Sequence, residues 1–232
     1  AACMEYPHNR PYTADDLVRI ITLLRDPVNG CPWDKVQTHT SIRMNFLEEA
    51  YEAVDALDLD DPVLMCEELG DVLMQVAFHT CMEQETGRFT WEQVCDGVCQ
   101  KLIERHPNIF GTQPGYEGIT DWDALKNKEK GRRTLADDLE SVPRAMPALM
   151  RAAKLQKRAA RHGAALQGAD AAALADAAEN LQTVQPASAQ AEQAVGELLF
   201  AAANLARQAG VDPEQALQKA NEAFCTAAGP VA

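Results

Sequence analysis

The sequence lacks three patterns that would place it in common structural classes. It has no alternating polar and apolar run of useful length, so β-strands are not predicted. No uncharged apolar run approaches the roughly 18 residues that a membrane-spanning helix needs. It also lacks a Lys/Arg-rich patch, and its formal net charge is −14, which argues against stable binding to nucleic acid.

The cysteines do not form the pattern of a disulfide-bonded protein. There are seven of them, an odd number, and they are scattered, mostly inside apolar helical segments. Disulfide frameworks instead use an even number at regular spacings. A secretory signal pattern before the first expected helix is also missing. We therefore expect reduced thiols and a cytoplasmic protein.

Helical periodicity is present along nearly the whole chain, which predicts an all-α fold. Ser, Thr, Asp and Pro residues stand where helices should begin, and Gly or Pro stands where they should end. The expected helices cover about 13–26, 40–57, 62–87, 90–106, 121–130, 141–163, 170–182, 187–209 and 213–228.

The chain contains a weak internal repeat. GDVLMQVAF at 70–78 resembles GELLFAAAN at 196–204, and VCQKLIER at 98–105 resembles ALQKANEA at 216–223. Two matches in the same order indicate a duplicated helical unit, and the alanine-rich second copy is the more degenerate one. We predict an amino-terminal unit at 1–118, connecting helices at 119–162 and a second unit at 163–232.

Acidic residues recur at helical spacing in two consecutive expected helices. Glu49 and Glu52 are three residues apart, as are Glu68 and Asp71, so each pair lies on one helix face. The short connection DLDDP makes the two helices antiparallel neighbours. The sequence therefore predicts that four carboxylates converge.

Converging carboxylates repel one another unless a cation neutralises them. Ligand sets made only of oxygen favour Mg²⁺ or Mn²⁺ over Zn²⁺ or copper. A solvated helix face paired with lysines is the common alternative, but EEAYEAVDALDLDD contains no Lys or Arg. A di-iron site is a second alternative, yet it usually needs Glu-x-x-His, and the helices that carry the acids have none.

Several segments resemble the MazG family of all-α nucleoside triphosphate pyrophosphohydrolases. EEAYE followed by ELGD resembles its EExxE and ExxD signature. GCPWDKVQTH and KLIERHPNIFG resemble two further family segments, and the resemblance is good over about 13–162 and weak over 163–232. It implies hydrolysis of a nucleoside triphosphate to the monophosphate and pyrophosphate with Mg²⁺, for which Mn²⁺ can substitute, in a homodimer.

The resemblance also implies roles for individual residues. Glu48 would be an outer ligand or the base that orients the attacking water, and Trp33 would lie beside the nucleobase. Lys101 and Arg105 would meet the phosphates and stabilise the charge that develops on pyrophosphate. The metal ligands would be Glu49, Glu52, Glu68 and Asp71.

Other interpretations of these residues stay open at this point. Trp33 can fill a hydrophobic gap beside Pro32, and Lys101 with Arg105 can be a surface pair. The whole chain can also be a non-catalytic nucleotide-binding or regulatory module, since its second copy has lost acids.

The loss of acidic residues from the second copy is visible when Gly196 is aligned with Gly70. Glu197 then stands opposite Asp71, and Ala194 stands opposite Glu68. We predict that the carboxy-terminal unit binds no catalytic metal and serves as scaffold or dimer surface.

Overall fold

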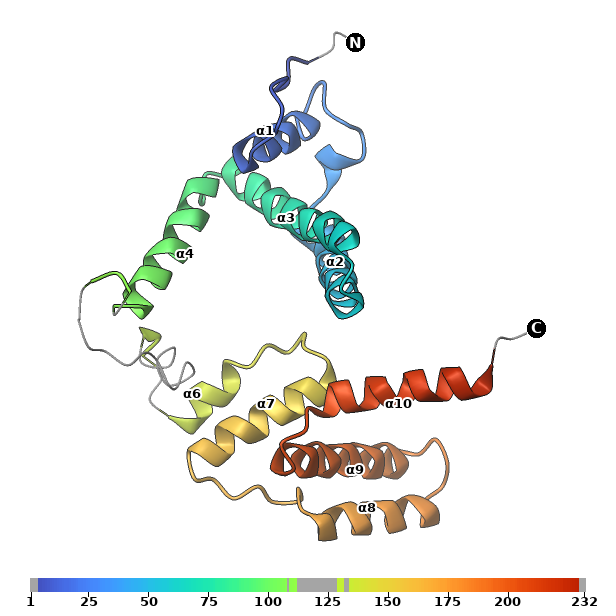
Figure 1. Cartoon of the computed structure of the whole chain (residues 1–232). Helices are drawn as coiled ribbons and strands as arrows, with labels where there is room; N and C mark the ends of the chain where they lie inside the picture. Colours follow the sequence, from blue (N-terminus) through green and yellow to red (C-terminus); the bar gives the residue numbers. More distant parts are fainter. Residues whose placement is uncertain (1–3, 108, 112–128, 132–133, 230–232) are drawn as a thin grey trace. The chain divides into compact units, whose positions relative to one another are not determined.

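The structure is a computed structural model, and it describes residues 4–107, 109–111, 129–131 and 134–229. Every regular element in these ranges is helical, which confirms the all-α prediction (Figure 1). None of the described helices is both long and apolar enough to cross a membrane. The chain divides into two compact units, Ala1–Ile119 and Thr120–Ala232. The three-part division expected from the sequence stays a prediction.

The described residues of the first unit form four α-helices and one short 3₁₀ helix. Each α-helix begins at a side-chain cap, three of them at a Thr that also forms a capping box and α3 at Asp61 before Pro62. The elements are α1 (Ala14–Leu24), η1 (Asp34–Val36), α2 (His39–Leu59), α3 (Pro62–Glu85) and α4 (Trp91–Arg105).

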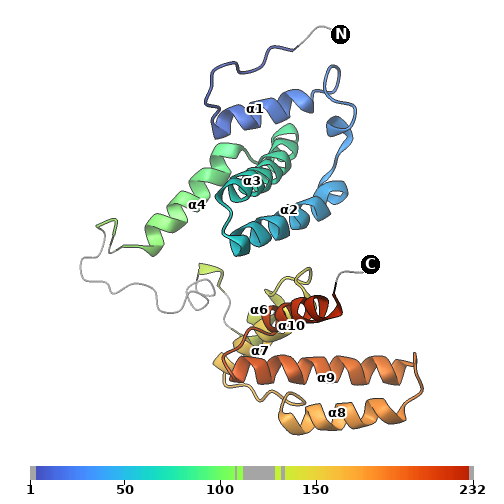
Figure 2. The same ribbon diagram turned by 45° about the vertical axis from the view of Figure 1, so that its right-hand side comes forward.

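Helices α2 and α3 form the central pair of this unit and lie side by side in both views (Figures 1 and 2). Only Asp60 and Asp61 separate them, so they run antiparallel. Helix α1 packs on α3, and the apolar core gathers around the second half of α3. The buried core residues are Val18, Ile21, Ile42, Ala77, Phe78, Cys81, Met82 and Trp91. The first half of α3, which carries the acids, lies outside this core.

The second unit has five described helices. They are α6 (Leu135–Glu140), α7 (Ala148–Arg161), α8 (Ala171–Thr183), α9 (Ala189–Gln208) and α10 (Pro213–Ala228). Helices α8 and α9 make a second adjacent pair, and α7 packs on α9. The last three helices lie within two residues of the boundaries that caps and Pro positions predict.

A buried ion-pair network connects α6 with α7. Asp138 is fully buried, and its Oδ1 lies 3.0 Å from Nη1 of Arg158. His162 Nε2 lies 3.1 Å from the other carboxylate oxygen, and Arg158 also donates to the Asp138 carbonyl and to Ser141. The network holds α6 on α7 because the buried carboxylate depends on its cationic partner.

Two helix predictions in the middle of the chain need comment. The helix expected over 141–163 begins only at Ala148, because Pro143 and Pro147 interrupt the turns before it, and α6 precedes them as a separate helix. The helix expected over 121–130 lies outside the described residues except for its last two positions.

Candidate metal centre

Three carboxylates of the first unit lie close together. Glu49 projects from the middle of α2, and Glu68 and Asp71 from consecutive turns of α3. One oxygen from each of them lies within 4.8 Å of the others, and all three side chains are half-buried. We refer to these three residues as the acid cluster. The structure thus brings together three of the four carboxylates that the spacing predicted to converge.

The electrostatics of the acid cluster favour protonation or cation binding. Burial raises the pKa of the Glu49 carboxyl, and the negative charges of Asp71 and Glu52 raise it further. Partial burial likewise raises the pKa of Glu68, followed by the charges of Glu52, Asp71 and Glu67. A divalent cation would relieve this repulsion, because it stabilises the ionised carboxylates.

The remaining two acids of EEAYE lie in different positions. Glu52 lies near enough for its charge to act on both Glu49 and Glu68, although it is more exposed and outside the three-residue group. Glu48 is exposed, and no hydrogen bond or ion pair joins it to another described residue. Its side chain is therefore not held by the acid cluster in the described chain.

Gln75 is a buried polar neighbour that hydrogen-bonds to Glu49 of the acid cluster. It lies one helical turn after Asp71 and is buried, and its amide nitrogen is 3.5 Å from Oε1 of Glu49. Sequence reasoning missed this residue, although its position four residues after Asp71 places it on the same face of α3.

The contact between α2 and α3 continues from the acid cluster into a pair of histidines. Phe46 lies against His79, and Nδ1 of His79 is 2.7 Å from Nδ1 of His39. His39 Nε2 in turn lies 2.5 Å from the buried carboxylate of Glu83, which also accepts from Arg88. Burial lowers the pKa of His79, and His39 beside it lowers that pKa further. These residues fix the start of α2 on α3 and were not predicted as site residues.

Trp33 lies in a loop whose backbone is held by hydrogen bonds from the Arg25 side chain. Arg25 is buried, and its guanidinium donates to the carbonyls of Asp34 (2.7 Å) and Gln37 (3.2 Å) while pairing with Glu85. Gly30 is required in this loop, because a Cβ there would lie 2.4 Å from two backbone oxygens. The Trp33 side chain itself is 56% exposed, so it does not fill a hydrophobic gap in the chain that the structure describes.

Lys101 and Arg105 lie four residues apart near the carboxyl end of α4. Lys101 is exposed and has no hydrogen-bond or ion-pair partner among the described residues, and Arg105 is half-buried. Figures 1 and 2 show α4 leaving the carboxyl end of α3 and running away from the α2–α3 pair. Glu68 and Asp71 belong to the amino-terminal half of α3, and no hydrogen bond or ion pair joins Lys101 to the acid cluster within the described chain.

The donor set tests which metal these residues fit. Every candidate ligand is a carboxylate, and neither His nor Cys belongs to the three-residue group. Hard divalent cations such as Mg²⁺ and Mn²⁺ prefer oxygen ligands of this kind. The residues present fit a hard divalent cation, and their raised pKa values agree with a site that needs one.

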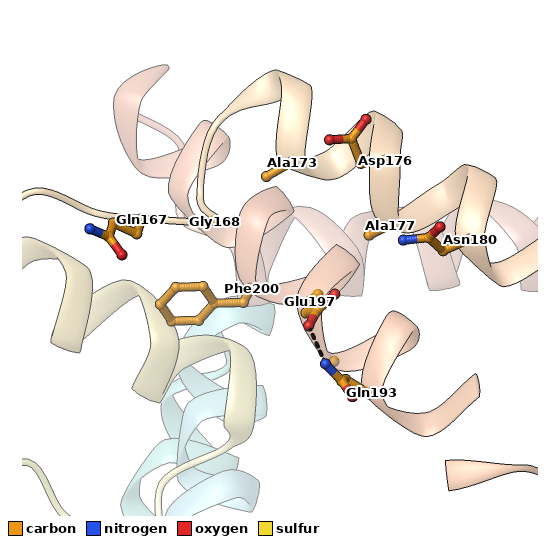
Figure 3. A pocket seen from close by; sticks show the side chains of 10 residues that line it. Gln167, Gly168, Ala173, Asp176, Ala177, Asn180, Gln193, Glu197 and Phe200 are labelled. Carbon is orange, nitrogen blue, oxygen red and sulfur yellow. Dashed lines mark hydrogen bonds between the residues drawn. The ribbon is translucent and has the colours of Figure 1, made fainter. Parts of the chain in front are cut away.

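The helix pair of the second unit that the repeat prediction matches to α2–α3 contains a groove. It has a volume of about 710 Å³ and lies between α8 and α9 (Figure 3). Asp176 and Glu197 are its only acids, and Glu197 accepts a hydrogen bond from Gln193 at 2.8 Å. Across the described residues, no second group of three metal-ligating side chains accompanies the acid cluster.

Comparison with known proteins connects this geometry to a family. The MazG nucleotide pyrophosphohydrolase domain matches residues 37–110, a range that holds the acid cluster, Lys101 and Arg105. The chain is 41% identical over 221 residues to the nucleoside triphosphate pyrophosphohydrolase of Escherichia coli K12, covering 90% of this chain and 83% of the relative. It is 39% identical over 212 residues to the nucleoside triphosphate pyrophosphohydrolase/pyrophosphatase MazG of Thermotoga maritima, covering 90% and 82%.

Proposed function

The chain belongs to the MazG nucleotide pyrophosphohydrolase family, and from this premise we propose that its first unit hydrolyses nucleoside triphosphates to the monophosphate and pyrophosphate. The observation that carries the proposal is the convergence of Glu49, Glu68 and Asp71 on two adjacent helices, with no cationic partner for any of them among the described residues. The reaction is attack of water at the α-phosphorus with pyrophosphate as the leaving group.

The acid cluster and Glu52 are proposed to hold Mg²⁺, with Mn²⁺ as a substitute. When bound, the cation supplies charge neutralisation on the triphosphate and lowers the pKa of a coordinated water. Glu52 is included because its charge already acts on Glu49 and Glu68. Glu48 is exposed and precedes Glu49 in the chain, and we assign it to accepting the proton of the attacking water or to outer coordination.

Lys101 and Arg105 are proposed to bind the phosphates and to stabilise the leaving pyrophosphate. No hydrogen bond or ion pair joins Lys101 to the acid cluster of its own chain among the described residues, and α4 runs away from the α2–α3 pair, so we propose that a homodimer supplies this contact. Apolar side chains that are about half exposed on the helices of the first unit support such an interface. They include Tyr51, Val54 and Leu57 on α2, Leu69 on α3, and Leu102 and Ile103 on α4.

Trp33 is proposed to lie against the nucleobase. Its ring is exposed, while Arg25 fixes the loop beneath it through two backbone carbonyls. A flat aromatic face on a rigid loop can stack on any base, because every nucleobase has a π-face.

We propose that the second unit is a degenerate copy of the first and holds no catalytic metal. The α8–α9 pair follows the order of α2–α3, but its groove carries only Asp176 and Glu197. The role left to this unit is scaffold or dimer surface. A cytoplasmic location is part of the same proposal, since the described cysteines are all free thiols.

The direct test is pyrophosphate release from each NTP and dNTP, measured with Mg²⁺, with Mn²⁺ and with EDTA. We expect release that needs the cation and is lost in Asp71→Asn. Absence of release from every nucleotide with either cation would overturn the proposal and favour a non-catalytic binding module.

A further inference from the structure

Gln75 is a polar side chain buried in the helix pair that carries the acid cluster. It is 7% exposed, and its neighbours along α3 include the buried apolar residues Ala77 and Phe78. A buried amide lowers the stability of a fold unless both of its ends are hydrogen-bonded. The contacts of the two ends of this amide therefore decide what the residue does.

The two ends of the Gln75 amide are not equally satisfied. The nitrogen Nε2 lies 3.5 Å from Oε1 of Glu49, whereas the oxygen Oε1 is enclosed and has no hydrogen-bond partner in the described part of the chain. The orientation follows from chemistry, since an ionised carboxylate only accepts hydrogen bonds and must face the NH₂ group. A side chain chosen for packing alone, such as Met, would fill this position without leaving a buried acceptor unpaired.

The second unit provides an internal comparison for this position. In the alignment of Gly70 with Gly196, Gln75 stands opposite Ala201, which is fully buried. The same alignment places Ala194 opposite Glu68. The amide is thus absent from a helix pair that keeps an acid opposite Asp71 but has alanine opposite Glu68, so packing of such a pair does not require it.

We infer that Gln75 is a positioning residue for the acid cluster, and that its amide holds the Glu49 carboxylate in place as a cation ligand at the expense of fold stability. Its own oxygen is enclosed by protein, so Gln75 acts through Glu49 and does not reach the cation. The inference deepens the proposed function and rests on it.

The test compares two buried glutamines whose side-chain oxygens both lack a hydrogen-bond partner among the described residues. Gln156 on α7 is 1% exposed, its Oε1 is likewise unpaired among the described residues, and its Nε2 donates to the Phe200 carbonyl instead of a carboxylate. Gln75→Met and Gln156→Met are titrated with Mn²⁺, followed by electron paramagnetic resonance, and their thermal unfolding is measured in EDTA.

We expect Gln75→Met to weaken Mn²⁺ binding about tenfold, the usual size of effects from residues behind a metal ligand. Its unfolding temperature without metal should rise by a few degrees, because the unpaired acceptor is removed. Gln156→Met should keep the wild-type Mn²⁺ affinity. In the activity assay, Gln75→Met should raise the Mg²⁺ concentration for half-maximal rate about tenfold, with kcat at saturating Mg²⁺ within about twofold of wild type.

Wild-type Mn²⁺ affinity in Gln75→Met would overturn the inference, whatever happens to its unfolding temperature. If that variant does not fold, Gln75→Ala takes its place, since alanine occupies the opposite position in the second copy. Failure of the proposed function looks different, because the wild-type protein itself would then neither bind Mn²⁺ nor release pyrophosphate.

Discussion

The α2–α3 pair of the first unit and the α8–α9 pair of the second are both closely packed adjacent helices, but they carry different side chains. Both pairs pack closely through small buried residues, Ala53 and Ala56 in the first and Ala177, Ala194 and Ala201 in the second. Only the first pair brings three carboxylates within 4.8 Å of one another. A helix pair of this kind therefore packs without converging acids, and their presence in the first unit calls for a ligand.

The two units also differ in how the negative charge of Asp138 and that of the acid cluster are compensated. Asp138 in the second unit is fully buried and is neutralised by Arg158, with His162 alongside. The acid cluster of the first unit has no such cation among the described residues, and burial together with the charges of neighbouring acids raises the pKa of Glu49 and Glu68. Asp138 is thus compensated within the protein, whereas the acid cluster has no compensating cation in the described chain.

The largest expected difference between the two units is in activity. Asp71→Asn removes a proposed metal ligand and should lower kcat by at least about a hundredfold. Glu197→Gln changes the residue opposite Asp71 in the second copy and should leave kcat within about twofold of wild type. Steady-state pyrophosphate release measures both, and a comparable loss in the two variants would show that the second unit is also catalytic.

The same Asp→Asn substitution should affect stability in opposite ways in the two units. Asp138→Asn leaves Arg158 without its buried partner and should destabilise the second unit by about 3 kcal/mol. Asp71→Asn relieves repulsion on Glu49, so the metal-free protein should be as stable as wild type or more so. Denaturant unfolding in EDTA measures both effects, and strong destabilisation by Asp71→Asn would contradict the account of the acid cluster.

Substitution of two lysines, one in each unit, should give a difference of intermediate size in kcat/KM. Lys101→Ala should lower kcat/KM about tenfold, because it removes one charge-assisted contact with the phosphates. Lys219 stands opposite Lys101 in the second copy, and Lys219→Ala should leave kcat/KM unchanged. Equal effects of the two substitutions would remove Lys101 from the proposed phosphate contact.

The smallest expected effect is a pH dependence that arises in the first unit. The pKa of His79 is lowered in the folded protein, where His39 and Glu83 with Arg88 lie in the same cluster. Below its ordinary value of 6.5 the unfolded chain then binds more protons, so stability should fall as the pH falls.

The pH-dependent contribution of His79 to stability should be absent from the His79→Gln variant. The measurement is the unfolding temperature of wild type and variant on either side of pH 6.5. An unchanged slope in the variant would assign the pH dependence to other groups.

Much of the fold could be predicted because its signals are local. Thr13 and Thr90 each cap a helix in the structure as predicted, and Pro62 and Pro213 stand at helix starts. Helix α6 was missed because six residues give too short an apolar pattern to read.

The acid cluster could also be predicted, because residues three apart on adjacent antiparallel helices share a face. Its surroundings could not be predicted in the same way. The contact of Gln75 with Glu49 and the stacking of His39 on His79 depend on the register between α2 and α3, which spacing within one helix does not fix. The distance of Lys101 from the acids likewise depends on the direction of α4.

The most direct test of the central claim is Mn²⁺ binding by three proteins: wild type, Asp71→Asn and Glu197→Gln. The account predicts that wild type and Glu197→Gln bind Mn²⁺ with the same affinity and stoichiometry, and that Asp71→Asn loses this binding. Retained Mn²⁺ binding in Asp71→Asn, or its loss in Glu197→Gln, would contradict a single metal centre in the first unit.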